Sequence, residues 1–296
     1  MKPAQFEYHR PDTVQEAVEL LDEMEHRAEL MAGNQSLGIM LSTRLATPEN
    51  VIDINRLDAL SGIEVADDRV RVGAMTRHRE IERSDALGRA VPMLPEAAEQ
   101  IAGPAVRNRG TFGGSIGEAD PAGNYPCAMA ALDGTIHLRS VDGEREVPAD
   151  EFFIAHMFTE LEENELIVGG SVDCSPWPSE RSGMAFDELK RAAQTWPTVS
   201  AAAAVRVDDP GAGDPTVEEA RLALANAADV PLGVPDAEDA VEGEPLSEGS
   251  LEAVAEATMA AADPEDEMHA DAEFKTEAAA EYARRAIRTA YERASG

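Results

Sequence analysis

Apolar positions in residues 1–55 alternate between helical spacing and short strand-like runs, which predicts a small α/β unit. The first helical pattern begins after Thr13, whose hydroxyl and the Glu16 carboxylate form a capping box. The predicted elements are a helix over residues 14–26, a strand at residues 29–31, a helix over residues 37–45 and a strand at residues 51–54.

The pattern changes over residues 56–175, where alternating apolar residues flank helical stretches. A β-hairpin is predicted over residues 63–72, and Thr76 is the predicted cap of a short helix that ends at Arg83. The other predicted elements are a helix over about residues 86–101, strands at residues 135–140 and 166–172, and a turn at residues 141–143. This section predicts an α+β unit with a central sheet.

Pro176-Trp177-Pro178 marks a predicted boundary to a C-terminal domain over residues 176–296. Three strands of an antiparallel sheet are predicted at residues 186–190, 200–207 and 219–226, a surface connection at residues 231–250, and helices at residues 251–262 and 274–294. In the last helix Tyr282, Ala286, Thr289 and Ala290 share a face, which we expect to pack on the sheet.

Two glycine-bearing loops lie about eighty residues apart: Ala32-Gly33-Asn34-Gln35-Ser36 and Thr111-Phe112-Gly113-Gly114-Ser115. Each precedes a predicted helix start, where several backbone N–H groups converge and form an anion site. One such loop alone is more often a plain strand-to-helix turn. Two such loops together predict that the chain binds both phosphates of a dinucleotide, and we expect this dinucleotide to be a flavin.

The chain is strongly acidic, with 58 Asp and Glu residues against 25 Lys and Arg and a formal net charge of -33. This charge argues against nucleic acid or an anionic membrane as a partner. Arginine carries most of the positive charge, since lysine occurs only at Lys2, Lys190 and Lys275. An acidic, lysine-poor chain that is still 43% hydrophobic predicts a halophilic, cytoplasmic protein.

The sequence offers no residues for bond-breaking or metal chemistry. Cys127 and Cys174 are isolated and cannot hold an iron–sulfur cluster, and the six histidines lack ligand spacing. No pattern indicates a nucleophile, a general acid or a general base. The start of the chain has no apolar signal core and no segment is apolar enough to span a bilayer, so we predict a cytoplasmic location with no metal site and no catalytic residue.

Five motifs in order resemble those of a known family. The first loop with Leu37 is similar to A-G-G-[QHT]-S-L, and Arg44-Leu45 through Ile54 is similar to the R-L-x-x-P-x-x-[LV]-[IV]-D-[IL] that follows it. Residues 73–76 read G-A-M-T, residues 101–115 carry an I-A…R-N-x-G-T-x-G-G-S pattern, and residues 119–122 read A-D-P-A. Together they resemble the FAD-binding medium subunits of molybdenum hydroxylases, the family of carbon monoxide dehydrogenase and xanthine dehydrogenase.

The resemblance covers nearly the whole chain and implies a fold and partners. It implies an α+β, two-subdomain FAD-binding fold of the vanillyl-alcohol-oxidase/PCMH type over residues 1–175, divided at residues 55 and 56, followed by the C-terminal medium-subunit domain. It implies FAD on this chain, molybdopterin on a large partner subunit and [2Fe–2S] clusters on a small one. The assembly would be a dimer of heterotrimers that passes electrons from the clusters through FAD to an external acceptor.

The resemblance also implies the cofactor-binding residues. Those expected at the pyrophosphate are Ala32, Gly33, Asn34, Gln35, Ser36, Leu37, Thr111, Gly113, Gly114 and Ser115. Asp120 and Asn124 are expected at polar groups of the cofactor, Ile101 and Trp196 against the flavin ring, and Lys190 near its electron-rich end. From the residues alone, Asp120 is equally a turn cap, Trp196 a core aromatic and Lys190 a surface charge.

Three departures from the family pattern keep alternatives open. Asn34 replaces the second glycine of the first loop, although asparagine tolerates a left-handed backbone. Asn124 stands where an aspartate is common, and Gln194-Thr195 where G-D is usual. The alternatives are a stand-alone FAD-dependent oxidoreductase of the same fold and a non-catalytic scaffold that has lost flavin.

Overall fold

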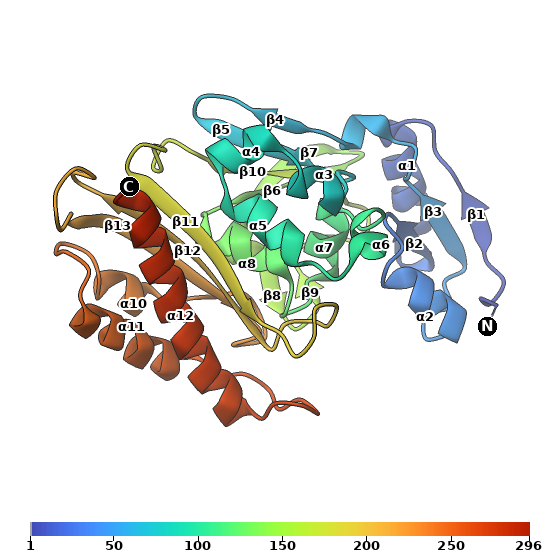
Figure 1. Ribbon diagram of the computed structural model, residues 1–296. Coiled ribbons are helices and arrows are strands. Elements are labelled where there is room, and N and C mark those ends of the chain that lie inside the picture. The colour runs from blue at the N-terminus through green and yellow to red at the C-terminus, as the bar shows by residue number, and fades with distance from the viewer. Residues whose placement is uncertain (1) are drawn as a thin grey trace.

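The computed structural model describes residues 2–296, and its larger sheets follow one another along the chain (Figure 1). The first sheet is parallel, in the order β1 (Glu7–His9), β3 (Asn50–Asp53) and β2 (Ala28–Met31), with α1 (Val14–Met24) and α2 (Leu37–Thr43) beside it. The predicted elements are confirmed, except that α1 ends at Met24, where a 3-10 turn, η1 (Glu25–Arg27), follows, and that the helix predicted over residues 37–45 ends at Thr43. Sequence reasoning missed β1, whose three residues are too short for a periodic pattern.

The second sheet is antiparallel and includes the predicted hairpin. Its order is β4 (Ile63–Val65), β5 (Arg69–Gly73), β10 (Leu166–Asp173), β6 (Thr135–Ser140) and β7 (Gly143–Pro148). The helices of this region are α3 (His78–Glu82), α4 (Asp85–Ala90), α5 (Met93–Gln100), α6 (Pro104–Arg107), α7 (Phe112–Glu118), α8 (Asn124–Ala131) and α9 (Ala149–Phe152). A two-stranded ribbon of β8 (Phe153–Ala155) and β9 (Phe158–Thr159) follows.

Two predictions in this region are wrong. The helix over residues 86–101 is two helices, because Pro92 disfavours a helical Val91, whose ψ of 74° ends α4. Thr76 does not cap α3; its hydroxyl donates to the Gly62 carbonyl and accepts from the Gly62 N–H, both at 2.9 Å, and Arg77 is the N-cap instead. The Thr76 hydroxyl therefore links the segment before β4, which contains Gly62, to the connection between β5 and α3.

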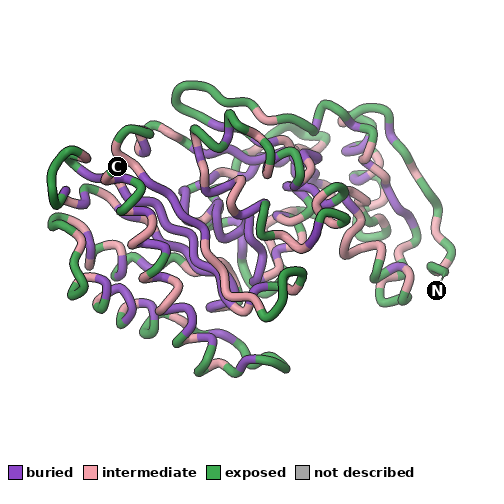
Figure 2. The backbone as a smooth tube through the Cα atoms, viewed as in Figure 1, coloured by how far each residue is buried: buried purple, intermediate pink, exposed green. Residues whose placement is uncertain are grey.

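The third sheet has buried residues on both faces. Its antiparallel order is β11 (Ser182–Leu189), β12 (Val199–Val207), β13 (Val217–Ala225) and β14 (Leu232–Gly233). In β12, Ala202 and Ala204 join the core beneath α5 and α8, whereas Ala201 and Ala203 join the core beneath α11 (Glu248–Ala261) and α12 (Ala272–Ala294). Figure 2 shows these strands as long buried segments.

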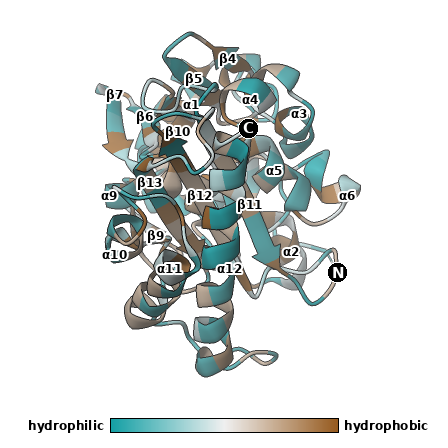
Figure 3. Cartoon of the chain, turned by 60° about the vertical axis from the view of Figure 1, so that its left-hand side comes forward, coloured by the Kyte–Doolittle hydropathy of each residue, from teal (hydrophilic) through white to brown (hydrophobic). Residues whose placement is uncertain are grey.

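Small residues let α12 lie close to this sheet (Figure 3). Ala286 and Ala290 are buried as predicted, but Tyr282 and Thr289 are only half-buried. A Cβ at Gly183 of β11 would overlap the Ala290 carbonyl, so glycine is required there. The α+β class and the antiparallel C-terminal sheet with its helices are confirmed, while the exact domain boundaries stay a prediction.

The segment at residues 231–250, predicted as a surface connection, also forms β14 and α10 (Pro235–Asp239). No helix in the described part of the chain, residues 2–296, is long and apolar enough to cross a membrane.

Candidate functional site: a junction of two glycine loops

The two glycine loops lie against each other, although about eighty residues separate them. A Cβ at Gly33 would be 2.5 Å from the Arg109 carbonyl oxygen and 2.7 Å from the Gly110 Cα. Real Cβ atoms do not approach a backbone so closely, so glycine is required at residue 33 for this contact. We call this contact, with residues 32–36 on one side and 109–115 on the other, the loop junction.

Asn55 and Arg77 hold the loop junction together, and sequence reasoning missed both. Arg77 donates to the Arg109 carbonyl at 2.6 Å and to the Asn55 side-chain oxygen at 2.8 Å. Asn55 in turn donates to the Ala32 carbonyl at 2.6 Å. Burial lowers the pKa of Arg77, with the nearby Arg109 charge adding to the effect. The only sequence signal was a polar side chain directly after a buried strand, which is too common to be decisive.

The first loop offers unused backbone donors. Across residues 2–296, no protein group accepts a hydrogen bond from the N–H groups of Gly33, Asn34, Gln35 or Ser36. Asn34 has φ of +59°, so the residue that replaces the family's glycine adopts the left-handed conformation. Gln35 stabilises the turn by donating to the Gly33 carbonyl at 2.7 Å. Donors left free in this way fit an anionic ligand.

The second loop differs, because most of its N–H groups already donate within the protein. The Phe112 N–H donates to the Thr76 carbonyl and the Gly113 N–H to the Ala74 carbonyl. The Gly114 N–H donates to the Thr111 hydroxyl and the Ser115 N–H to the Thr111 carbonyl, and the four distances are 2.7–3.1 Å. Gly113 is required for packing, since a Cβ there would be 2.6 Å from the Ala74 Cβ. What this loop presents to a ligand is the exposed Gly114 surface and the half-buried Ser115.

A carboxyl group lies beside this junction. Burial raises the pKa of Glu118, at the end of α7, and a hydrogen bond from the Ser36 hydroxyl opposes that rise. The nearby Asp120 charge raises the pKa further. The contact places the end of α7, and with it the Glu118 carboxyl, beside the first loop.

Two of the residues predicted at the cofactor, Asn124 and Lys190, meet at Glu188, where α5 and α8 pack against the third sheet. Lys190 contacts the Gln100 carbonyl and the Glu188 carboxylate, next to Ile101. Asn124 is buried and donates to the Ala97 carbonyl at 3.0 Å and to Glu188 at 3.3 Å. Burial raises the pKa of Glu188, and the hydrogen bond and charge of Lys190 oppose the rise. We call this set of contacts the domain junction.

The exposure and contacts of three side chains decide between the alternative interpretations of these predicted cofactor residues. Trp196 is 55% exposed, so its interpretation as a core aromatic is wrong. The Lys190 side chain is only 11% exposed, so it is not a solvated surface charge. Asp120 accepts from the Ala122 N–H at 2.9 Å and therefore does cap a turn, while remaining half-exposed.

Arg107 fixes the segment that carries Ile101. It forms an ion pair with Glu82 at 3.0 Å and donates to the carbonyls of Ile101 and Ala102 at 3.0 and 3.1 Å. Ala102 has φ of +41°, and these bonds hold the bend in place. Arg107 therefore fixes the position of the backbone at Ile101 and Ala102.

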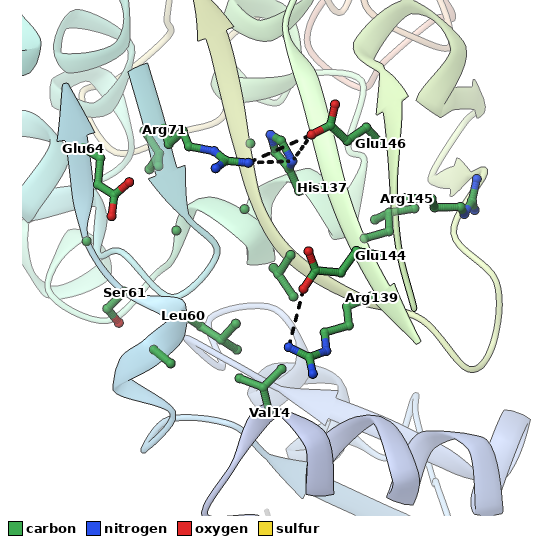
Figure 4. A pocket seen from close by; sticks show the side chains of 18 residues that line it. Val14, Leu60, Ser61, Glu64, Arg71, His137, Arg139, Glu144, Arg145 and Glu146 are labelled. Carbon is green, nitrogen blue, oxygen red and sulfur yellow. Dashed lines mark hydrogen bonds and ion pairs between the residues drawn. The ribbon is translucent and has the colours of Figure 1, made fainter. Parts of the chain in front are cut away.

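A cavity of about 580 Å³ lies elsewhere, on the second sheet, and none of the predicted FAD residues lines it (Figure 4). His137 is 3.1 Å from Glu146 and 2.8 Å from the Ser171 hydroxyl, with Arg71 beside it. Burial lowers the pKa of His137, opposed first by Glu146. This is a cross-strand ladder of polar groups on the sheet.

The described residues also bring together two exposed groups with metal-ligand atoms, one of them Glu25, His26 and Glu163 and the other His156, Asp229 and Glu265. Neither includes a residue of the loop junction. The absence of a metal site stays a prediction.

Two protein-family models match the chain. Residues 4–172 match the FAD binding domain in molybdopterin dehydrogenase, and residues 184–290 match the CO dehydrogenase flavoprotein C-terminal domain. The carbon monoxide dehydrogenase medium chain of Hydrogenophaga pseudoflava is 37% identical, over 99% of each chain. The nicotine 6-hydroxylase medium subunit of Paenarthrobacter nicotinovorans is 32% identical, over 97% of this chain and 98% of that one.

Solved structures agree with these matches. A carbon monoxide dehydrogenase structure from Hydrogenophaga pseudoflava superposes with a TM-score of 0.93 at 38% identity and covers 99% of both chains. Quinoline 2-oxidoreductase from Pseudomonas putida 86 superposes with a TM-score of 0.92 at 30% identity, over 100% of both chains. Fold, loops and matches together define an FAD-binding subunit of an oxidoreductase. The chain belongs to the FAD-binding medium subunits of the molybdenum hydroxylases, which include those of carbon monoxide dehydrogenase and xanthine dehydrogenase.

Proposed function

We propose that this chain binds FAD at the loop junction and relays electrons through it from [2Fe–2S] clusters to an external acceptor. The observation that carries the proposal is the contact of the two loops, with free N–H groups of residues 33–36 beside the Gly114 surface and Ser115. Bound FAD accepts electrons singly and delivers one or two, which links one-electron clusters to a two-electron acceptor.

The residues of the chain hold and orient FAD in this proposal. The first loop donates N–H groups to the pyrophosphate, and the Ser36 and Ser115 hydroxyls add donors. Asp120 accepts from hydroxyls of the cofactor, and the ring lies against Ile101 and Trp196. Lys190, already paired with the buried Glu188, supplies positive charge near the electron-rich end of the ring.

The partners we propose are a molybdopterin-binding large subunit and a small subunit with two [2Fe–2S] clusters, arranged as a dimer of heterotrimers. Support comes from relatives named medium chain or medium subunit, which implies other chains. It also comes from cysteine chemistry, because this chain has two cysteines and a [2Fe–2S] cluster normally takes four thiolates.

We further infer a halophilic, cytoplasmic setting from the net charge of -33. At low salt, the like charges repel one another and destabilise the folded chain, and salt screens them. Thermal unfolding in about 0.1 M and about 3 M KCl tests this inference. We expect the melting temperature to rise with salt; an unchanged or lower value contradicts it.

Cofactor analysis tests the proposed function. The chain is purified in molar KCl together with its partner subunits, and the chromophore released by denaturation is identified by chromatography. One equivalent of FAD is expected. No flavin, even after FAD is added, contradicts the proposal and favours a scaffold, whereas FAD on a chain that binds neither partner favours a stand-alone oxidoreductase.

A charge variant tests the location of the pyrophosphate. Ser115→Asp adds a carboxylate within the first turn of α7, where the helix dipole stabilises it, so the fold is retained. We expect FAD to bind more than about tenfold more weakly because the carboxylate repels the phosphates. The matched control is Ser179→Asp, an exposed serine outside both loops. Equal FAD affinity in the two variants contradicts the proposed location.

A further inference from the structure

Lys275 is a fully buried lysine that the proposed function does not use. It is 1% exposed and lies in the first turns of α12. Its ammonium group donates to the Asn226 side-chain oxygen at 3.0 Å, the Glu265 carbonyl at 3.1 Å and the Glu267 carboxylate at 2.9 Å. All three of its N–H donors are thus satisfied, as a buried ammonium requires.

Asn226 connects this lysine to two other segments. It follows β13 with φ of +59°, and its backbone N–H donates to the Pro121 carbonyl at 2.7 Å. Its side-chain amide donates to the Thr198 carbonyl at 3.0 Å and to Glu267 at 2.7 Å, with the Pro197 carbonyl at 3.4 Å. Burial tends to raise the pKa of Glu267, but the hydrogen bonds from Asn226 and Lys275 more than offset this and lower it.

The two segments held by Asn226 carry two of the predicted cofactor contacts, Asp120 at its hydroxyl groups and Trp196 at the ring. Pro121 directly follows Asp120, and Pro197 directly follows Trp196. We infer that Asn226, Lys275 and Glu267 form a hub, buried at Asn226 and Lys275, that positions the Asp120 and Trp196 segments relative to each other around the flavin. This inference rests on the proposed function and adds positioning residues to it.

The geometry favours positioning over simple stabilisation. Trp196 is 55% exposed, so packing of its own side chain holds it only weakly. The segment from Trp196 to Thr198 depends on backbone contacts such as that of the Thr198 N–H with the Leu189 carbonyl at 2.7 Å and on the amide of Asn226. Burial of the Lys275 ammonium group is also a costly way to gain stability, because a charge removed from water loses its hydration.

Asn226→Gly is the main test variant. Glycine adopts a positive φ without strain and keeps the N–H to Pro121, so only the side-chain bonds to Thr198, Glu267 and Lys275 are lost. Glu267→Gln is a milder second variant, since it keeps an acceptor for Asn226 but removes the charge that pairs with Lys275. Either variant keeps the inference testable if the other does not fold.

Arg293→Met is the matched control. Arg293 lies 18 residues after Lys275 on α12, about 27 Å along the helix. It also joins α12 to the FAD-binding region through an ion pair with Glu96 at 2.7 Å, and it donates a hydrogen bond to the Met184 carbonyl of β11. The control therefore removes a charged contact of the same helix, far from the hub.

The readout is flavin fluorescence of the FAD-loaded complex with its partner subunits, because a stacked indole quenches flavin emission. We expect emission to rise several-fold in Asn226→Gly and to rise less in Glu267→Gln, with wild-type emission in Arg293→Met. In a Trp196→Ala background, Asn226→Gly should cause no further rise, which is the coupling expected of residues that act through one another.

Two results would overturn the hub. One is a melting temperature that falls equally in Asn226→Gly and Arg293→Met while the emission of both stays at the wild-type value. The other is that Asn226→Gly raises the flavin emission by the same amount in the wild-type background and in the Trp196→Ala background. A wild-type complex that binds no FAD overturns the proposed function as well, so the two failures are distinguishable.

Discussion

The loop junction and the domain junction are built in different ways. At the loop junction, backbone meets backbone, glycines provide the close approach, and the first loop keeps four N–H groups free. At the domain junction, side chains such as Asn124, Glu188 and Lys190 meet from separate segments, and their polar atoms are bonded to one another. The loop junction therefore offers a fixed set of donors that suits an anion of fixed geometry. The domain junction instead depends on side chains that bond to one another.

Gly33→Ala should break the loop junction with the largest effect of the changes considered. The new Cβ would be 2.5 Å from the Arg109 carbonyl oxygen, so one loop must shift and the free N–H groups move with it. We expect FAD affinity to fall by about 100-fold or more, because displacements near 1 Å suffice for losses of this size. Isothermal titration of the flavin-free chain with FAD measures it.

Gly88→Ala is the control for that experiment. Gly88 lies inside α4, and a Cβ there meets nothing within 4 Å. This variant should bind FAD normally and gain about 0.5–1 kcal/mol of stability, since alanine is the better helix former. FAD affinity that is unchanged in Gly33→Ala would show that the loop contact does not shape the site.

Acid should lower the stability of the folded chain through His78, which lies beside the loop junction. This side chain packs beneath Gly110, and burial lowers its pKa to about 4, helped by the charges of Arg77 and Arg107. The unfolded chain takes up a proton near pH 6.5, whereas the folded chain does so only near pH 4, so stability falls as the pH drops through this window. The shift corresponds to about 3 kcal/mol.

Denaturant unfolding at several pH values between 7 and 4 measures this effect. His78→Leu, which cannot titrate, should lose less stability over the window than the wild type by about 3 kcal/mol. His26→Leu, at an exposed position, should keep the wild-type dependence. Parallel curves for His78→Leu and the wild type would exclude His78 as the source.

Arg77→Ala should have an intermediate effect on FAD binding. It removes the bonds to the Arg109 carbonyl and to Asn55, which fix the two loops relative to each other. We expect about a tenfold loss of FAD affinity, equivalent to about 1.4 kcal/mol. Arg77→Lys should not restore it, because an ammonium group cannot reproduce the fork of the guanidinium. Full affinity in Arg77→Lys would mean that only the positive charge matters.

Sequence reasoning succeeded for features that are determined by residues close together in the chain. The loops, the strands of the three larger sheets other than β1, β7 and β14, and the last helix follow from glycine positions and apolar spacing, and Asn34 adopts the left-handed backbone expected of it. It failed for the 86–101 helix, where the backbone restriction imposed by Pro92 overrides helical spacing.

The contacts that assemble the loop junction and the hub around Lys275 were beyond sequence reasoning. Asn55 and Arg77 are polar residues in connections, and their role exists only once residues 32 and 109 are brought together. Asn226 and Lys275 stand 49 residues apart and gave no signal except the rarity of lysine. Tertiary hydrogen bonds of this kind leave no periodic pattern.

Substitution of Glu118 should change FAD affinity the least of the variants considered. It also distinguishes the two junctions most directly, because Glu118 lies at one and Glu188 at the other. Its raised pKa means that it gains a proton at a higher pH than an ordinary glutamate, and the neutral form does not repel a diphosphate. FAD affinity should therefore increase as the pH falls through this pKa, by about fivefold or about 1 kcal/mol. Glu118→Gln should bind FAD at neutral pH as tightly as the wild type does in acid and lose the pH dependence, whereas Glu188→Gln, at the domain junction and away from the phosphates, should keep it. A pH dependence that persists in Glu118→Gln but vanishes in Glu188→Gln would move the phosphate-sensing carboxyl to the domain junction.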